Sequence, residues 1–255
     1  MRIMFLNKAP KKSVAYNPVE IEKLLNSYAS PGTRIEIGFP DDFEGARVEQ
    51  VLGEQKMLNG LDHMMEQPSL IRKIVWAADN GYDAVIQSNT FDPGVDGGRL
   101  AVNIPILGPF RTTLHIATNL ADRIGIIVPL AAHVPYTWRL LRTYGMDRFV
   151  TNIRSLGVYG TDLKSQKEAI TANAAGLVEG LVHESGAECV IPLGGALIPY
   201  IVDPAELQRR TGVHVFNTKA VTIRVAELCV GLGLTQSPLT YPRGNLTYRD
   251  FVQTA

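Results

Sequence analysis

The chain has 255 residues, of which 45% are hydrophobic and 20% charged, and its 25 basic and 25 acidic residues leave no formal net charge. The length predicts one large or two modest domains, and the composition predicts a packed core. The balanced charge, with no basic stripe, argues against nucleic acid as a partner, and no apolar run reaches the ~20 residues that cross a membrane. We therefore expect a cytoplasmic protein with no membrane partner, and zero net charge leaves a homo-oligomer open.

Strand-like and helix-like segments alternate along the first half of the chain, which predicts a parallel sheet with helices on its faces. Asn17 and Pro18 are typical of a helix start, an N-cap followed by proline. Apolar residues then recur at helical spacing up to Tyr28, before Ser30-Pro31-Gly32 ends the segment. The expected strands are residues 3–6, 33–38, 83–87 and 104–107, and the further expected helices are residues 43–58 and 69–80.

The second half repeats this alternation, with Gly145 as a left-handed helix cap and Asp203-Pro204 as a helix start. The expected strands are residues 123–128, 153–158, 188–193 and 213–216, and the helices lie between and after them. The pattern predicts an α/β fold of two similar Rossmann-like halves, each a roughly four-stranded parallel sheet flanked by helices, with a cleft between them. We assign residues 1–107 and 215–255 to the first half and 108–214 to the second.

The most informative stretch is Ser88-Asn89-Thr90, which follows a short apolar strand and leads into Phe91 and a turn at Asp92. Open α/β sheets bind ligands at the carboxyl ends of their strands. We therefore predict that Ser88 is catalytic and that Asn89, Thr90 and Phe91 bind substrate. The alternative is structural: Ser88 only caps the strand end, and Asn89 closes an Asx-type turn onto Asp92.

Two other strand ends carry candidate substrate contacts. Asn7 follows the first strand, and Gly194 and Gly195 follow the strand at 188–193. Glycines let the backbone approach a ligand closely, although a plain turn that needs positive φ also favours them. We predict that Asn7, Gly194 and Gly195 bind substrate.

The start of the helix after residue 108 is a further candidate. Thr112 or Thr113 is suited to cap this helix, and the free amides of a helix start favour an anion. Arg111 is suited to pair with a substrate carboxylate, although a positive charge there opposes the helix dipole. We predict that Arg111, Thr112 and Thr113 bind substrate, with a solvated Arg111 and simple helix caps as the alternatives.

The remaining reactive side chains indicate neither a metal nor a cofactor. Cys189 and Cys229 lack metal-ligand or disulfide spacing, and their apolar surroundings predict buried, inert thiols. His115 and His133 are candidate bases for Ser88, with structural roles as the alternative, and His63 beside an aspartate is no metal signature. No glycine-rich nucleotide loop occurs. We expect no metal and no cofactor.

At these strand ends the chain resembles the aspartate/glutamate/hydantoin racemase superfamily, over most of its length. The opening strand with Asn7 is similar to the family's first strand and its substrate-contacting asparagine. Ser88-Asn89-Thr90 is similar to the Cys-Asn-Thr that closes a strand in glutamate racemases. The resemblance implies a substrate that is a small carboxylate, amide or cyclic amide, bound in the cleft. Further similar segments are residues 92–96, 104–109, 114–117, 141–145, 155–158, 212–215, 226–227 and 232–234.

This chain departs from the family pattern at both positions where the family has a cysteine. Family racemases use two cysteines, one from each half, to remove and return a proton beside a carbonyl. Here Ser88 stands at the first cysteine position, and Leu193-Gly194-Gly195 stands where the family reads Leu-Gly-Cys, while Cys189 lies earlier in the strand. A serine hydroxyl is a far weaker acid than a thiol, and glycine transfers no proton through a side chain.

Because of this departure we expect a hydrolase or lyase rather than a racemase. Ser88 would act as nucleophile or acid, and strand-end amides would stabilise an oxyanion or enolate. The alternatives are a racemase or isomerase with altered bases, and a protein that binds a small molecule without catalysis.

Overall fold

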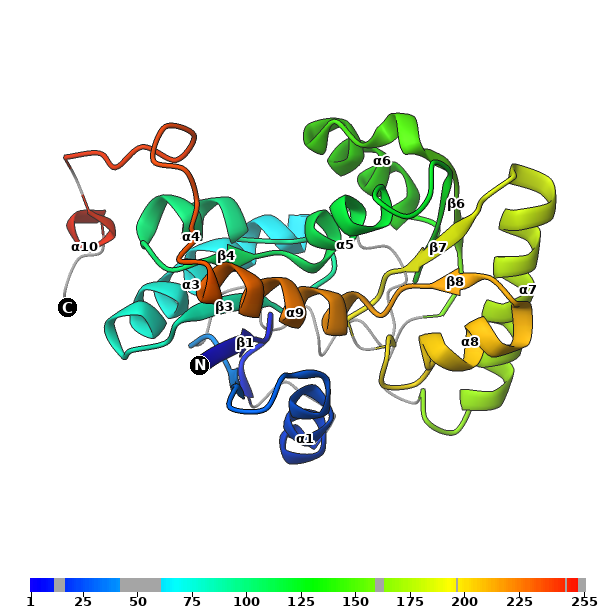
Figure 1. Ribbon diagram of the computed structural model, residues 1–255, viewed down its shortest axis with the longest axis horizontal. Helices are drawn as coiled ribbons and strands as arrows, with labels where there is room; N and C mark the ends of the chain where they lie inside the picture. The colour runs from blue at the N-terminus through cyan, green and yellow to red at the C-terminus, as the bar shows by residue number, and fades with distance from the viewer. Residues whose placement is uncertain (12–16, 42–60, 159–162, 196, 246, 252–255) are drawn as a thin grey trace. The chain divides into compact units, whose positions relative to one another are not determined.

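The structure is a computed structural model that describes residues 1–11, 17–41, 61–158, 163–195, 197–245 and 247–251. Its framework is two four-stranded parallel sheets flanked by helices (Figure 1), which confirms the predicted α/β fold. The chain divides into two compact units. Unit 1 comprises Met1–Ala46, His63–Gly108 and Thr222–Ala255, and unit 2 comprises Arg47–Asp62 and Pro109–Val221. The predicted cleft and the predicted division of residues between the halves stay predictions.

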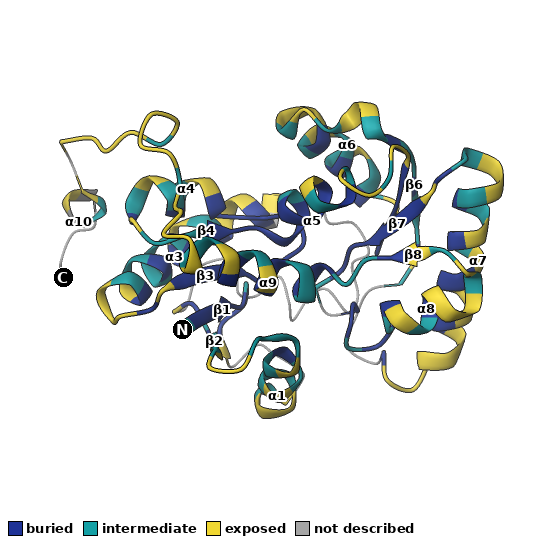
Figure 2. Ribbon diagram, in the orientation of Figure 1, coloured by how far each residue is buried: buried dark blue, intermediate teal, exposed yellow. Residues whose placement is uncertain are grey.

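The sheet of unit 1 has the strand order β2-β1-β3-β4, and every pair is parallel. Successive side chains point to opposite faces. Ile3 and Phe5 pack with residues of α1 and α9, whereas Met4 and Leu6 pack with residues of α3 and α4. Both faces of the sheet are therefore buried (Figure 2). The elements of this unit are β1 Arg2–Leu6, α1 Pro18–Tyr28, β2 Arg34–Gly38, α3 Leu61–Asp79, β3 Ala84–Gln87, α4 Val95–Ala101, β4 Ile106–Leu107, α9 Thr218–Gly231, whose first turn belongs to unit 2, and α10 Tyr248–Phe251.

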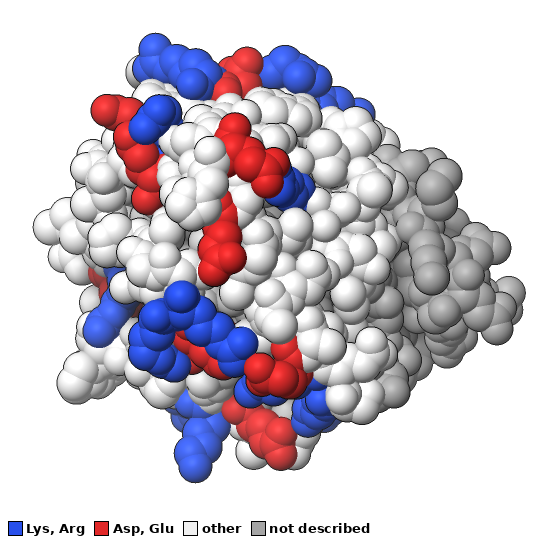
Figure 3. All heavy atoms as spheres, turned by 90° about the vertical axis from the view of Figure 1, so that its right-hand side faces the viewer, with Lys and Arg blue, Asp and Glu red and all other residues white. Residues whose placement is uncertain are grey.

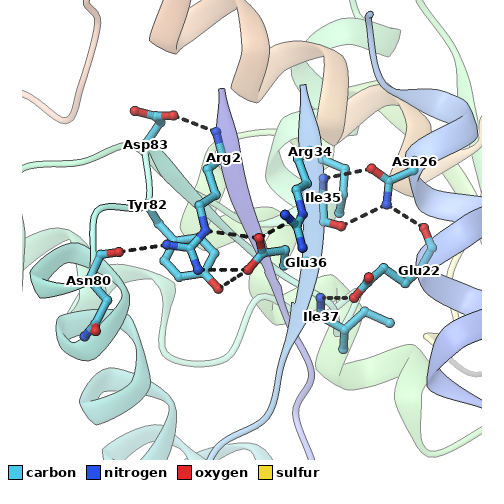
Figure 4. Close-up of polar contacts among 10 residues, drawn as sticks. All are labelled: Arg2, Glu22, Asn26, Arg34, Ile35, Glu36, Ile37, Asn80, Tyr82 and Asp83. Atoms are coloured by element: carbon cyan, nitrogen blue, oxygen red, sulfur yellow. Dashed lines mark hydrogen bonds and ion pairs between the residues drawn. The ribbon is translucent and has the colours of Figure 1, made fainter. Parts of the chain in front are cut away.

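A charged network ties the amino ends of β1, β2 and β3 together (Figure 4). Glu36 accepts hydrogen bonds from Arg2 Nε at 3.1 Å and from the Tyr82 hydroxyl at 2.6 Å. The Arg2 backbone N–H donates to Asp83 at 2.6 Å, and Arg34 lies 3.0 Å from Glu36. The hydrogen bond from Arg2 lowers the pKa of Glu36, and burial raises the pKa of Tyr82 to about 12.

The sheet of unit 2 has the order β6-β5-β7-β8, again fully parallel. Ile127 and Val190 pack with Val178 and Leu181 of α7 and with Leu207 of α8 in one buried cluster. Gly145 has φ 68° and caps α6, as predicted. The elements of this unit are α5 Pro109–Ala117, β5 Ile124–Val128, α6 His133–Tyr144, a short 3-10 turn Asp147–Phe149, β6 Val150–Ser155, α7 Lys167–Ser185, β7 Cys189–Pro192, α8 Pro204–Thr211 and β8 His214–Val215.

The outer surface of unit 2 carries both signs of charge. Figure 3 shows acidic and basic side chains interspersed on the face that lies at the right of Figure 1. Within unit 2, Arg210 pairs with Glu168 at 3.0 Å and with Glu206 at 2.5 Å. This face therefore presents no extended patch of one sign. Of the helices that the structure describes, none combines the length and the apolar character needed to cross a bilayer.

Helices α3 and α4 and strand β6 differ from the sequence prediction. Helix α3 begins at Leu61 rather than at residue 69 and contains Pro68. Helix α4 was not predicted, because Gly97 and Gly98 are poor helix formers. A Cβ on either glycine would lie within 2.6 Å of the terminal methyl of an isoleucine of α3, so an added side chain would force that isoleucine to move. Strand β6 starts at residue 150, not 153, and ends before Gly157, whose φ is 75°. The predicted helix 43–58 lies outside the described residues.

Candidate active site

The carboxyl edge of the unit 1 sheet brings two of the predicted site residues, Asn7 and Ser88, together. Leu6 and Gln87 are paired in the register of β1 and β3, so the next residues on both strands emerge at one edge. The Ser88 hydroxyl donates to Asn7 Oδ1 at 3.3 Å, and the Asn7 amide donates to the Ala9 carbonyl at 3.1 Å. Both side chains are buried. The hydroxyl is therefore paired with an amide oxygen, which is not a base.

The residues after Ser88 form a tight buried turn. Asn89 Oδ1 accepts the Phe91 N–H at 3.0 Å, and the Asp92 N–H donates to the Asn89 carbonyl at 3.1 Å. Asp92 has φ 54°, in the left-handed region that aspartate tolerates better than most residues. The structure thus confirms the alternative Asx-type turn for Asn89. The predicted substrate contacts of Asn89, Thr90 and Phe91 stay predictions.

Gly108 packs against this turn from the end of β4. An added Cβ at Gly108 would lie 2.3 Å from Asp92 Cγ and 2.7 Å from Asp92 Cβ. Real side chains do not approach so closely, so only glycine fits beside Asp92. The ends of β1, β3 and β4 therefore form one continuous polar edge, built from the segments at Asn7, at Ser88–Asp92 and at Gly108.

Three ionisable side chains that sequence reasoning did not assign to the site lie beside this edge. His63 Nδ1 is 3.3 Å from Glu66 Oε1, and the Lys8 ammonium is 3.7 Å from the same oxygen. The His63 ring lies 5.3 Å from the ring of Phe91, centroid to centroid. His63 and Glu66 are almost fully buried. Buried ionisable groups are costly unless paired, so this cluster is a candidate for function. A sequence feature that could have revealed this pair is the i, i+3 spacing of His63 and Glu66, which places both side chains on one face of α3.

In unit 2 the predicted helix caps are wrong. Helix α5 starts at Pro109, so Thr112 and Thr113 lie inside it and are buried. Proline is favoured at a helix start, and here the helix begins at Pro109, before either expected cap. The Arg111 guanidinium lies 5.5 Å from the centroid of the Tyr144 ring, a cation–π contact on the protein itself. Substrate binding by Arg111, Thr112 and Thr113 stays a prediction.

The end of β7 places Gly194 in a conformation that glycine alone adopts readily. Gly194 has φ 131°, and its carbonyl accepts the N–H groups of Leu197 at 3.0 Å and Ile198 at 2.9 Å. The structure therefore confirms the alternative reading, a turn that needs positive φ. Close approach of a ligand to Gly194 and Gly195 stays a prediction.

A buried lysine that sequence reasoning missed supports this turn. Lys219 is fully buried, and its Nζ donates to the Gly195 carbonyl at 2.9 Å and to the Ile198 carbonyl. Burial lowers its pKa to about 7. The sequence shows only a lysine near a helix start, and no periodic pattern marks it as buried.

The thiols and the other histidines have structural surroundings. Burial raises the pKa of Cys189 to about 11 and also raises the pKa of Cys229, so both thiols are poor nucleophiles at neutral pH. His133 Nδ1 accepts the Leu130 N–H at 3.3 Å, whereas His115 is exposed on α5. Across the residues that the structure describes, no three His, Cys, Asp or Glu side chains gather into a metal-binding group.

A surface depression of about 530 Å³ lies in unit 2, but it is distinct from the polar strand ends. It borders the first residues of β7 and β8, Cys189 and His214, and is also lined by Leu120 and Gln208. The strand-end turn at Gly194 is not part of its lining. The residues that line this depression are therefore different from those of the candidate site at the strand ends.

Comparison with known proteins assigns the chain to a family. The family model of Asp/Glu/Hydantoin racemase matches residues 40–226. A hydantoin racemase of Rhizobium meliloti is 26% identical over 187 residues, which cover 72% of this chain and 76% of the relative. The crystal structure of allantoin racemase from Pseudomonas fluorescens is similar with a TM-score of 0.82 and 23% identity, covering 97% of this chain and 98% of that one.

A more distant solved structure has the same fold. Maleate isomerase from Pseudomonas putida S16 is similar with a TM-score of 0.61 and 12% identity, covering 92% of this chain and 93% of that one. At these identities the solved structures support the fold alone, whereas the family match covers well over half of the chain. This protein belongs to the Asp/Glu/hydantoin racemase family and is a racemase- or isomerase-like enzyme.

Proposed function

We propose that the protein is a cofactor-independent isomerase or racemase that removes and returns a proton on the carbon beside a carbonyl. Its substrate is a small carboxylate or cyclic amide. The observation that carries this proposal is the pairing of the Ser88 hydroxyl with the Asn7 amide oxygen, with the ionisable groups of His63 and Glu66 buried next to Phe91. In the part of the chain that the structure describes, the site thus offers proton-transfer groups but no activated nucleophile.

The chemistry of the strand ends suits an enolate-like intermediate. Removal of a proton beside a carbonyl leaves negative charge on the carbonyl oxygen, and hydrogen-bond donors placed around that oxygen stabilise it. The polar edge at Asn7 and Ser88 holds amide and hydroxyl groups of this kind. Hydantoin and allantoin, named in the relatives, are cyclic amides with such a carbon, and we propose this substrate class for the protein.

Solvent exchange tests the proposal. The wild-type protein is incubated in D2O with single enantiomers of 5-substituted hydantoins, allantoin, aspartate and glutamate. Loss of the α-proton signal in ¹H NMR and loss of optical rotation are followed beside a protein-free sample. We expect faster exchange than in the protein-free sample for at least one compound. Binding of these compounds with no exchange and no product would instead support a non-catalytic binding protein.

A hydrolase or lyase with Ser88 as nucleophile is the second candidate. The observation in its favour is a buried hydroxyl at the end of a central strand. Such a serine needs a base within hydrogen-bond reach. Among the described contacts of Ser88, the hydroxyl donates to Asn7 and to neither an imidazole nor a carboxylate. New product signals in the same NMR spectra, lost in Ser88→Ala, would favour this candidate.

A further inference from the structure

The surface depression in unit 2 lies away from the strand ends that form the candidate active site. Its volume is about 530 Å³, which is within the range of small-molecule sites. It borders Cys189 and His214, which pair at the amino ends of β7 and β8, and every residue that lines it belongs to unit 2. Ligands of open α/β sheets bind at the opposite, carboxyl edge. A molecule held in the depression therefore occupies a different site.

Part of the lining is apolar. Leu120, Val215 and Phe216 all contribute to it, and Leu120 is 71% exposed although it is a large hydrophobic residue. An apolar side chain at a concave surface gains from being covered, because the covering molecule displaces water from apolar surface. This part of the lining therefore favours a ligand with an apolar body.

Two side-chain amides supply hydrogen-bond donors to the rest of the lining. Gln208 Oε1 accepts the Val215 N–H at 3.4 Å, and Asn217 Oδ1 accepts the Ala220 N–H at 3.1 Å. Since the backbone holds both oxygens, the two amino groups are left as the donors of these side chains. Among the described hydrogen bonds, neither amino group donates to the protein. The imidazole of His214 is exposed in the same lining, so a ligand group that accepts hydrogen bonds suits this part.

The charges around the depression favour an anion over a cation. Glu188 is the acidic residue of the lining, and its carboxylate accepts the backbone N–H groups of Asp122 at 2.9 Å and Arg123 at 3.1 Å. It also pairs with the Arg123 guanidinium at 3.2 Å, so the protein itself compensates its charge. Helix α9 begins directly after Asn217, and the positive end of its dipole adds to this balance. Because none of the described lining residues is lysine or arginine, a singly charged carboxylate suits the depression better than a phosphate.

We propose that this depression is a second binding site of the protein, which takes a small carboxylate with an apolar body. The carboxylate oxygens accept hydrogen bonds from the amino groups of Gln208 and Asn217, and the apolar body covers Leu120 and Phe216. This inference does not rest on the proposed function, because no bond of the ligand is made or broken here. The site is open to solvent beside the exposed Gln208, so a minimal ligand binds with modest affinity.

Three fluorinated probes that share one aromatic ring test the chemical class of the ligand. Para-fluorophenylacetate carries a carboxylate, para-fluorobenzylamine an ammonium, and para-fluorobenzyl alcohol no charge. Each is titrated into the wild-type protein and followed by ¹⁹F NMR. We expect saturable binding of the acid with a Kd of about 1–10 mM, as is usual for a ligand of about 11 non-hydrogen atoms, and binding of the amine at least about 10-fold weaker. Equal binding of the three probes, or no saturation by the acid, would overturn the proposal.

Substitutions locate the bound acid. Gln208→Glu and Asn217→Asp keep the size of each side chain but replace the amino donor with a charged acceptor, so the double variant should bind the acid at least about 10-fold more weakly. Ala205→Glu is the matched control, because it adds the same charge at an exposed position of α8 outside the lining. Ser88→Ala is the control for the candidate active site, and both controls should bind like the wild type. Binding that is lost in Ser88→Ala and unchanged in the double variant would place the acid at the strand ends and overturn the proposal.

A measurement on the wild-type protein holds even where the double variant fails to fold. Leucine methyl groups are labelled with ¹³C, and the Leu120 signal is identified by its absence from the spectrum of Leu120→Met. We expect this signal to move along the same binding curve as the ¹⁹F signal of the acid. A Leu120 signal that stays in place at saturating acid would overturn the proposal, because the acid then binds elsewhere.

Discussion

Gly108→Ala tests how tightly the polar edge of unit 1 is built. The new methyl group would lie 2.3 Å from Asp92 Cγ, whereas carbon atoms in contact are about 3.5–4.0 Å apart. Asp92 must therefore shift by more than about 1 Å, although it is buried and its φ of 54° is already in a restricted region. Overpacking of this kind costs about 1–3 kcal/mol. We expect the upper part of that range, about 2–3 kcal/mol.

This cost is measured as a change in the free energy of unfolding in urea, and as a fall in Tm of about 4–12 °C at 2–4 °C per kcal/mol. Asp92→Gly removes the obstructing side chain, so the double variant should recover much of the loss. Gly231→Ala is the control in the same unit, because its Cβ would meet only Met1 Cε at 3.8 Å. A Gly108→Ala protein as stable as this control, or a double variant whose loss equals the sum of the two single losses, would refute the reasoning.

Three further predictions concern single side chains. The proposed function makes Ser88 a substrate contact and not the nucleophile, so Ser88→Ala should raise KM while kcat stays within a few-fold of the wild-type value. A kcat loss of about 100-fold or more, of the size expected for a reacting group, would contradict this role. Glu36→Gln should lower the free energy of unfolding at pH 7 by about 1–3 kcal/mol, since it weakens charged hydrogen bonds with Arg2 and Tyr82 that are partly screened by solvent. The lowered pKa of Glu36 means that this contribution fades as pH falls below about 4.3, where urea titrations of the two proteins should converge. Between pH 7 and about 10 the unfolded chain holds a proton on Lys219 that the folded protein has released. The free energy of unfolding of the wild type should therefore rise with pH relative to that of Lys219→Met. Parallel plots of this free energy against pH for the two proteins would contradict the lowered pKa of Lys219.

Periodicity predicted the fold well because the strands of both sheets are short apolar runs bounded by turn residues. The helix start at Asn17-Pro18 is one example: Asn17 accepts the Val19 N–H at 3.1 Å, as the pattern predicts. Prediction failed where tertiary packing overrides local preference. Helix α4 contains Gly97 and Gly98, which lie close to isoleucine side chains of α3. Local helix propensity cannot predict this contact, because it depends on which element packs against α4.

The candidate site was predictable only in part, for a similar reason. Strand ends are visible in a sequence, so Asn7 and Ser88 could each be named as candidates. Their proximity is a finding of the structure, which pairs β1 with β3. Burial of a charged side chain is not visible, because it depends on what covers the residue. Glu66 and Lys219 look like ordinary surface residues in their helices, and only the packed structure shows that both are enclosed.

The two ends of the unit 1 strands differ in what a substitution there would disturb. At the amino end, hydrogen bonds from Arg2 and Tyr82 to Glu36 link β1, β2 and the segment just before β3. At the carboxyl end, Asn7 and Ser88 follow β1 and β3, and the apolar side chains of these strands are packed in the core on both faces of the sheet. Directed evolution of new substrate preferences should therefore randomise Asn7 and Ser88, and keep unchanged both the opposite edge and the packed turn of Asp92 against Gly108. Libraries of that design should retain folded members at a high rate, because these two positions lie at the other end of the strands from the bonds among Arg2, Glu36 and Tyr82.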